Sequence, residues 1–243
     1  MKYYLSAIGS CEDRVFENNT FKTILSSFAV DAKKILPLLN DMGGYDVMVD
    51  SGAFSALGRG IVINIDEYLG FIQQFPEEWY YINLDVMLPR NATEKEIRNC
   101  EEQGYENYLY LSKKVKNLLP VYHYGEDIKV FKRYCELSDY VCINMNKKGK
   151  KGIDKDDYLS EIFSISRDKV KVHGLAITSI PLLYRYPFYS ADSISYQRGA
   201  VFEKQKYWAH GKLKAILYQS LRDWKYLEQQ ITNLWKERGI IWT

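Results

Sequence analysis

The chain has 243 residues, of which 47% are hydrophobic and 26% are charged, and its formal net charge is +2. This composition is ordinary for a globular protein, and the length suits one α/β barrel with little sequence left for a second domain. No apolar run approaches the roughly 20 residues that a membrane span needs, and the mild charge does not by itself indicate a nucleic-acid binder.

The cysteines indicate a reducing compartment. Cys11, Cys100, Cys135 and Cys142 are scattered without a C-x-x-C spacing, and a strand-like KYYLSAIGS follows Met1 where a secretory leader would stand. We therefore expect a cytoplasmic protein.

Short β-branched and aromatic runs alternate with longer amphipathic stretches along the whole chain, which is typical of repeated βα units. Strands are expected near residues 2–9, 24–29, 45–50, 80–86, 119–124, 140–145, 171–176 and 188–194. This pattern predicts an α/β fold, a minimal (β/α)8 TIM barrel that occupies residues 1–243 as a single domain.

Helices are expected between these strands, at residues 31–42, 65–75, 93–117, 127–137 and 155–167. Asp31 and the Thr93–Glu96 pair have the chemistry of helix N-caps, whereas Pro37 disfavours a regular first helix. Two prolines in residues 180–187 predict a short, irregular crossover. A long helical segment at about 203–238 carries an apolar stripe, which we interpret as core packing.

Three aspartates occur at or near the ends of predicted strands, where a parallel barrel gathers side chains at one mouth. Asp50 ends YDVMVD, Asp85 ends WYYINLD, and Asp192 lies within FYSADSISY. Most aspartates at such positions cap helices or turns. Three carboxylates at one mouth repel one another, so a fold tolerates them mainly where a reaction, a metal or a substrate uses them.

Further candidates for substrate binding are expected at the same rim. They are Ser51 and Gly52 in a turn of small residues, His123, Tyr124 and Gly125 after one strand, Asn144 after the next, and His173, Gly174 and Leu175 on another. A lone strand histidine is more often a core residue than a catalyst, and this alternative stays open for both histidines.

Two basic clusters are candidates for phosphate contacts, although lysine runs are commonly solvated faces. The first contains Lys147, Lys148, Lys150 and Lys151, and the second contains Lys204, Lys206, Lys212 and Lys214.

Four segments together resemble the tRNA-guanine transglycosylases, which are (β/α)8 barrels that exchange guanine for a 7-deazaguanine base. The segment VDSGAFS at 49–55 resembles their D-S-G-G-F motif, and Asp85 matches their guanine-reading aspartate. HGLAI at 173–177 resembles G-G-L-A-V, and SADSISYQR at 190–198 resembles the segment with the nucleophilic aspartate and a following arginine.

The chain departs from that family in three ways. Ala53 replaces a glycine, VYHYG stands where the family has V-Q-G, and the C-terminal region has no C-x-C-x-x-C and histidine zinc site. We therefore expect no metal or other cofactor and no zinc subdomain. Without the zinc site the chain looks more like the reduced, phage-type DNA-guanine transglycosylases. This resemblance favours DNA over tRNA as the polymer and implies the cytoplasm of a phage-infected or bacterial host.

The resemblance implies a role for each matching residue. Asp192 is the expected nucleophile, Asp50 the general acid and base, and Asp85 the acceptor for guanine N1 and N2 hydrogens. Phe54 is expected to stack on the base, and backbone amides near Gly174 and Leu175 to reach its O6. Arg198 and the two lysine clusters are the expected phosphate contacts for a flipped-out nucleotide.

Three alternatives remain open. The same acids fit a tRNA-guanine transglycosylase or an N-glycosidase with water as the acceptor, and a barrel that only binds nucleic acid would not need them. The expected partners are DNA, with tRNA as the alternative, and a 7-deazaguanine base, but no membrane. A homodimer or accessory modification proteins are compatible with the sequence.

Overall fold

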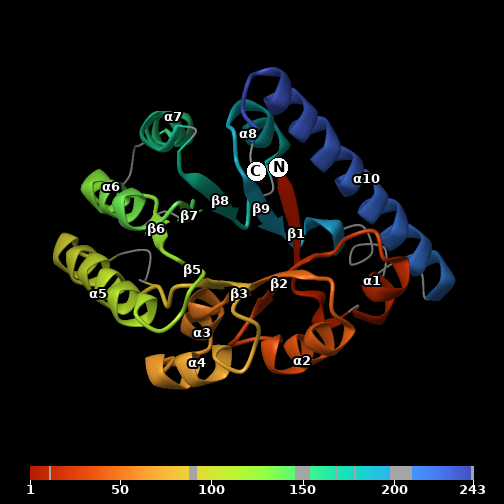
Figure 1. Ribbon diagram of the computed structural model, residues 1–243, viewed down its shortest axis with the longest axis horizontal. Coiled ribbons are helices and arrows are strands. Elements are labelled where there is room, and N and C mark those ends of the chain that lie inside the picture. The colour runs from red at the N-terminus through yellow and green to blue at the C-terminus, as the bar shows by residue number, and fades with distance from the viewer. Residues whose placement is uncertain are drawn as a thin grey trace.

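The computed structural model describes residues 1–10, 12–87, 92–145, 154–167, 169–177, 179–197 and 210–241. Nine parallel strands form the centre of this described structure, and helices surround them (Figure 1). The strands are β1 (Lys2–Ser6), β2 (Thr23–Ser27), β3 (Asp46–Asp50), β4 (Tyr80–Ile82), β5 (Leu118–Leu119), β6 (Val121–His123), β7 (Tyr140–Asn144), β8 (Lys171–Leu175) and β9 (Ser190–Ser193).

The strand order is β5-β4-β3-β2-β1-β9-β8-β7-β6, so the two outermost strands are consecutive in the chain. Only Pro120 separates β5 from β6, and the Pro120 carbonyl accepts a hydrogen bond of 2.9 Å from the Cys142 amide of β7. The sheet therefore forms a nearly closed, TIM-like α/β barrel, as predicted. The strand predicted at 119–124 is two short strands because proline has no N–H for the ladder, and this split makes nine strands of the expected eight.

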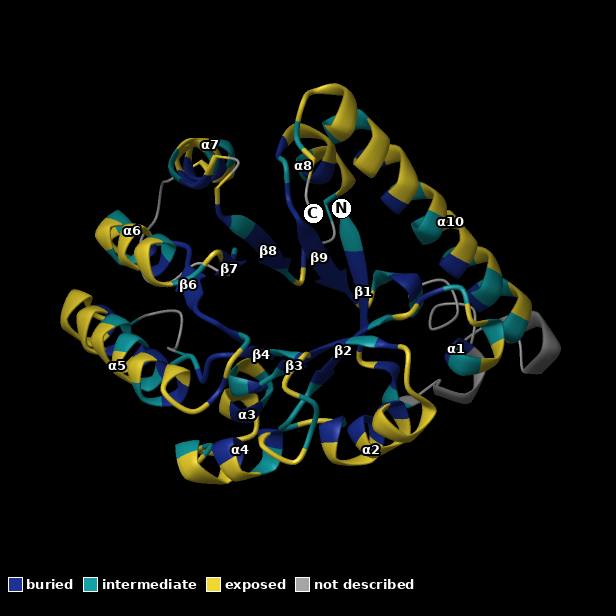
Figure 2. Cartoon of the chain, viewed as in Figure 1, coloured by how far each residue is buried: buried dark blue, intermediate teal, exposed yellow. Residues whose placement is uncertain are grey.

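The helices lie outside the strands and carry their exposed faces away from them (Figure 2). They are α1 (Glu12–Asn18), α2 (Ala32–Met42), α3 (Ala53–Gly58), α4 (Ile65–Ile72), α5 (Glu94–Ser112), α6 (Ile128–Leu137), α7 (Lys155–Ser166), α8 (Ile180–Arg185) and α10 (His210–Glu237), with 3-10 turns η1 (Ile8–Ser10) and η2 (Ser195–Gln197). None of the helices in the described ranges is long and apolar enough to cross a membrane.

The two predicted N-caps have different outcomes. The capping box of Thr93 and Glu96 at the start of α5 is confirmed. Asp31 occupies the N-cap position of α2, as predicted, but its side chain makes no cap bond to the helix. Asp31 instead accepts bonds of 2.7 Å from the Ser26 hydroxyl and 3.1 Å from the Ser27 amide, so it fixes the loop that follows β2.

Prolines disturb the helices less than expected. Pro37 lies within α2, and α8 is a short helix where an irregular crossover was predicted, with Pro181 in its first turn. The first turn tolerates proline because the N–H it lacks would have no partner in the helix. The helices α1 and α3 were not predicted, and α3 replaces most of the expected turn of small residues after Asp50.

Strand β4 is shorter than the predicted strand at 80–86 and ends at Ile82. Beyond it the Asn83 side-chain amide donates to the Gly104 carbonyl at 2.9 Å, and the Asp85 amide donates to the Asn83 carbonyl at 2.9 Å. The backbone thus turns away from the ladder, and Asp85 lies on a turn past the strand end.

The packing role predicted for the C-terminal stripe is confirmed within the described part of α10, while residues 203–209 lie outside it. Leu217, Leu221 and Ile231 are buried, and the Trp224 ring stacks on Tyr3 of β1 with 4.4 Å between ring centroids. The helix therefore covers the outer face of the barrel at β1.

Candidate active site

The inside of the barrel is apolar over most of its length. Side chains alternate between the two faces of each strand, and the inward ones form one cluster. The buried members of this cluster are Tyr4, Leu25, Met48, Ile82, Leu119, Val121, Tyr140, Cys142 and Tyr189. Two residues further along their strands, Met48 is followed by Asp50, Val121 by His123, and Cys142 by Asn144. The inward side chains therefore change from apolar to polar at the carboxyl ends of the strands.

Asp50 is the last residue of β3, and its Oδ2 accepts a hydrogen bond of 3.0 Å from the Gly52 amide. Burial, followed by the negative charges of Asp85 and Asp192, raises the pKa of Asp50 to about 7, although the hydrogen bond from the Gly52 amide acts in the opposite direction. The two other carboxylates therefore lie close enough to Asp50 to interact with it, and the mouth contains a group that is half protonated near neutral pH.

Tyr68 of α4 joins the strand ends that bear Asp50 and Asp85. Its buried hydroxyl lies 2.7 Å from the Ile82 carbonyl of β4 and 3.2 Å from the Val49 carbonyl of β3. Ile82 is the last residue of β4, and Val49 is the second-last residue of β3. This side chain therefore fixes the spacing of the strand ends that carry the two acids.

Gly52 lets the chain turn directly after β3. Its φ is +76°, and a Cβ at this position would lie 2.3 Å from the Ser27 hydroxyl and 2.8 Å from the Ala29 Cβ. We expect Gly52→Ala to destabilise the fold by roughly 2 kcal/mol or more, because backbone strain and a clash add. Gly60→Ala is the matched control, since Gly60 ends α3 with a left-handed turn and a φ of +67°, but no atom lies within 4 Å of the added Cβ.

Urea denaturation measures both variants. The control should lose about 1 kcal/mol from backbone strain alone, and equal losses in the two variants would contradict the close approach at Gly52.

Asp85 is held by hydrogen bonds from two sides. The Ser51 hydroxyl donates to its Oδ1 at 3.3 Å, and the His123 Nε2 lies 2.9 Å from its Oδ2. The other ring nitrogen of His123, Nδ1, lies 2.9 Å from Glu126 Oε1, and the His123 amide donates to Glu126 Oε2 at 3.0 Å. Asp85, His123 and Glu126 therefore form a continuous chain, which we call the Asp85 triad. Sequence reasoning missed Glu126.

Asp192 lies in β9 and is 5% exposed, and its Oδ1 accepts a bond of 2.8 Å from the Ala176 amide after β8. His173 Nε2 is 3.3 Å from the same oxygen, which is an ion-pair distance, but the pair lacks the alignment of a hydrogen bond. His173 Nδ1 lies 2.6 Å from the Ser190 hydroxyl, which contacts the Tyr140 hydroxyl. His173 is fully buried, so it lies behind Asp192 and is closed to a ligand in this conformation.

Other predicted binding residues belong to the strand ends or to the segment that follows β3. Asn144 is level with His123 in the ladder of β6 and β7, and Leu175 packs on the apolar interior at the end of β8. Ser51 is buried beside Asp85, whereas Phe54 on α3 is 63% exposed.

Three other predicted residues have different surroundings. The Tyr124 ring packs edge-on against Tyr158 of α7, with 4.7 Å between centroids, so it lies in the outer layer and not with the carboxylates. Gly125 forms the turn after β6 with a φ of +100°. At Gly174 an added Cβ would lie 2.5 Å from the Ile177 side chain, which explains this glycine by close packing.

The predicted phosphate contacts Arg198, Lys147, Lys148, Lys150, Lys151, Lys204 and Lys206 all lie outside the described residues, and so does the side chain of Lys212. Lys214 is described, and its ammonium lies 2.6 Å from Glu17 Oε1.

A pocket of about 420 Å³ adjoins the mouth, and Asp85 is part of its wall. Most of its other lining is apolar and comes from α3, the segment after it, and the turn after β4, including Ala56, Leu57, Ile61, Val62, Leu84 and Met87. This volume is within the range that small-molecule sites have. A mostly apolar pocket therefore adjoins the mouth at Asp85.

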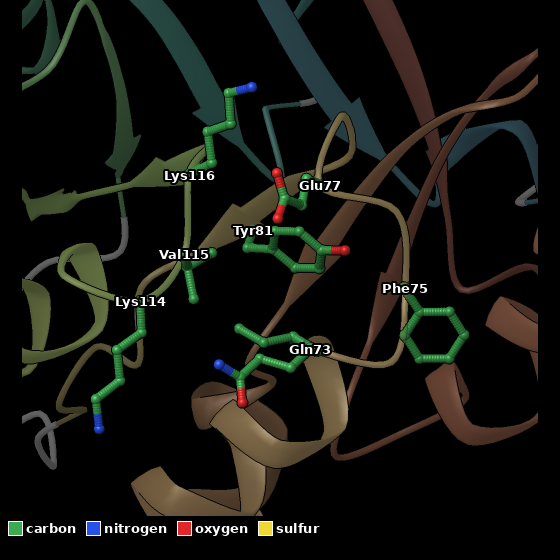
Figure 3. Close-up of a pocket in the computed structure, with 8 residues that line it drawn as sticks. Gln73, Phe75, Glu77, Tyr81, Lys114, Val115 and Lys116 are labelled. Carbon is green, nitrogen blue, oxygen red and sulfur yellow. The ribbon is translucent and has the colours of Figure 1, made fainter.

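A second pocket, of about 350 Å³, lies at the other end of the barrel wall, where α4 and α5 lead into β4 and β5 (Figure 3). Tyr81 lies at its centre with Gln73, Glu77 and Lys116 around it. None of the three mouth aspartates lines this pocket, and we assign it no part in the site.

No protein-family model matches the chain, and no curated protein matches it either. The described residues contain no group of three or more His, Cys, Asp and Glu side chains arranged to hold a metal ion. Function is therefore inferred from the residues of the mouth and from the resemblance of their sequence motifs.

Proposed function

We propose that the protein exchanges guanine in a nucleic acid for a 7-deazaguanine base, through a covalent intermediate on Asp192. The observation that carries this proposal is the convergence of three carboxylates at one mouth, where Asp85 and Asp192 both raise the pKa of Asp50. Breaking an N-glycosidic bond needs this set, because one carboxylate must trap the cationic sugar while another group moves a proton.

Each acid has one part in the proposed reaction. The Asp192 carboxylate attacks C1′ as the bond to guanine breaks, and Asp50 gives its proton to the leaving base. The incoming base then loses a proton to Asp50 and displaces Asp192 from C1′, which restores the enzyme. Asp50 suits both directions because its pKa of about 7 leaves it protonated in part of the population at neutral pH.

Substrate recognition in this proposal uses Asp85, which accepts hydrogen bonds from the N1 and N2 hydrogens of guanine, and Phe54, which stacks on the base. DNA is the proposed polymer because the C-terminal sequence lacks a cysteine and histidine set like that of the tRNA enzymes. A cytoplasmic setting, in which Cys100, Cys135 and Cys142 stay reduced, is part of the proposal.

Isotope exchange tests the proposal. The protein is incubated with radiolabelled guanine and either double-stranded DNA or tRNA, and the polymer is then separated from free base. We expect label in DNA. Label in tRNA alone would change the polymer, abasic sites without label would identify a hydrolase, and binding without either product would identify a barrel that only binds nucleic acid.

A further inference from the structure

The imidazole of His123 lies between two carboxylates and is almost sealed from solvent. Its side chain is 2% exposed, and the side chains of Asp85 and Glu126 are 10% and 4% exposed. Both ring nitrogens lie 2.9 Å from a carboxylate oxygen, which is hydrogen-bond distance on each side. Glu126 follows His123 by three residues, across the turn at Gly125.

Counting hydrogens shows what this geometry requires. Each of the two contacts needs one hydrogen, and a neutral imidazole carries only one N–H. The second hydrogen must come from a doubly protonated ring or from a protonated carboxyl. Each carboxyl also accepts a further bond, from the Ser51 hydroxyl at Asp85 and from the His123 amide at Glu126. Carboxylates that accept two donors are stabilised in the ionised form, so the extra proton belongs on the ring.

We propose that the Asp85 triad holds His123 as an imidazolium, and that Glu126 is a positioning residue that keeps Asp85 an ionised acceptor facing the mouth. The second part rests on the proposed function. If Glu126 did not hold the Nδ1 hydrogen, a neutral ring could present its Nε2 lone pair to Asp85. Asp85 would then have to carry the hydrogen itself, and it would no longer accept two N–H groups from one ligand edge.

The ionisable groups that surround the triad are acids or neutral side chains, which do not repel a positive charge on His123. Asp50 faces it from β3, Cys142 from β7, Tyr134 from α6 and Tyr158 from α7. Burial raises the pKa of Cys142, Tyr134 and Tyr158, and the nearby carboxylates raise it further, so these three side chains are neutral at neutral pH. An imidazolium offsets the charge that Asp85 and Glu126 bring into this buried region.

Nitrogen NMR of the imidazole rings tests the protonation state directly, and the chain has only three histidines to assign. The protein is labelled with 15N-histidine, and His123→Gln identifies the His123 signals. At pH 8 a free histidine, with an ordinary pKa of about 6.5, is almost wholly neutral. We expect both nitrogens of His123 to be protonated at pH 8, and Glu126→Gln to give a neutral ring.

Asp127→Asn is the matched control, because it removes the carboxylate next to Glu126 in the sequence, and the exposed Asp127 side chain accepts its bond of 2.9 Å from the Lys129 amide. It should leave the His123 signals unchanged. If all three histidine rings of the unmodified protein were neutral at pH 8, the proposal would be overturned, and this outcome needs neither a variant nor an assignment.

Binding of free guanine tests the positioning role. Glu126→Gln should weaken guanine binding by about tenfold or more, the effect of losing one hydrogen bond to a charged group. Binding of hypoxanthine, which lacks the 2-amino group, should weaken less. A neutral ring in the variant with unchanged guanine affinity would overturn the positioning role. No guanine binding by the unmodified protein would contradict the proposed function and leave the NMR result to decide the protonation state.

Discussion

Replacing Asp192 with asparagine is expected to slow the proposed base exchange by roughly 10³-fold or more. The amide has nearly the shape of the carboxylate but cannot form the glycosyl ester, and losses of this size follow the removal of a catalytic nucleophile. Exchange of labelled guanine into DNA measures the rate, and a denaturing gel detects the covalent adduct between protein and DNA.

Asp46→Asn is a control for the loss of an inward carboxylate. Asp46 begins β3 at the opposite end of the barrel, where it pairs with the Lys2 ammonium at 2.6 Å. Exchange per folded molecule should survive this change. A covalent adduct formed by Asp192→Asn would show that another group is the nucleophile.

Replacing Asp50 with asparagine is expected to stabilise the protein at pH 8 by a few kcal/mol and to have little effect near pH 4. The folded state raises the pKa of Asp50 from an ordinary 3.8 to about 7. Between these values the folded protein binds a proton that the unfolded chain has released, so the free energy of unfolding falls as pH rises. It falls by about 1.4 kcal/mol per pH unit at most and levels off above pH 7.

Urea denaturation at several pH values checks this, with the difference between the two proteins as the readout. Asparagine resembles the protonated carboxyl, so the two curves should converge toward acid pH. A difference that stays constant from pH 4 to pH 8 would mean that Asp50 titrates as an ordinary carboxyl. The same change should also slow base exchange if Asp50 moves the proton.

The pattern of the sequence was sufficient to predict the barrel and the strands that carry Asp50 and Asp192. Asp50 and Asp192 lie in short strands that the sequence located, and a parallel barrel gathers the residues at the carboxyl ends of its strands at one mouth. Asp85 lies at the mouth as predicted, but the predicted strand extends beyond the observed end of β4 at Ile82. The hydrogen bond from Asn83 to Gly104 that accompanies this strand end joins residues 21 apart, so the local sequence does not reveal it. The split at Pro120 was visible in the sequence, because a proline within a run argues against a continuous strand.

The remaining differences depend on contacts that one sequence does not display. Glu126 has the sequence context of any turn acid, and its one signal is the H-x-x-E spacing from His123. Alternation places His173 inward, yet its depth below the rim depends on the register of β8 against its neighbours. Tyr124 is next to His123 in sequence but faces the helices. The six residues of α3 are too few for helical periodicity to stand out.

The apolar filling of the barrel also bears on how substrates come and go. Tyr4, Tyr140 and Tyr189 occupy the inside below the acids, and the Tyr4 hydroxyl donates to Asp46 at 2.8 Å beside the Lys2 ammonium. The inside of the barrel is therefore filled below the mouth and does not form a tunnel. A ligand that enters at the mouth must leave by the same opening. In the proposed exchange, the released guanine therefore has to dissociate before the incoming base can bind in its place.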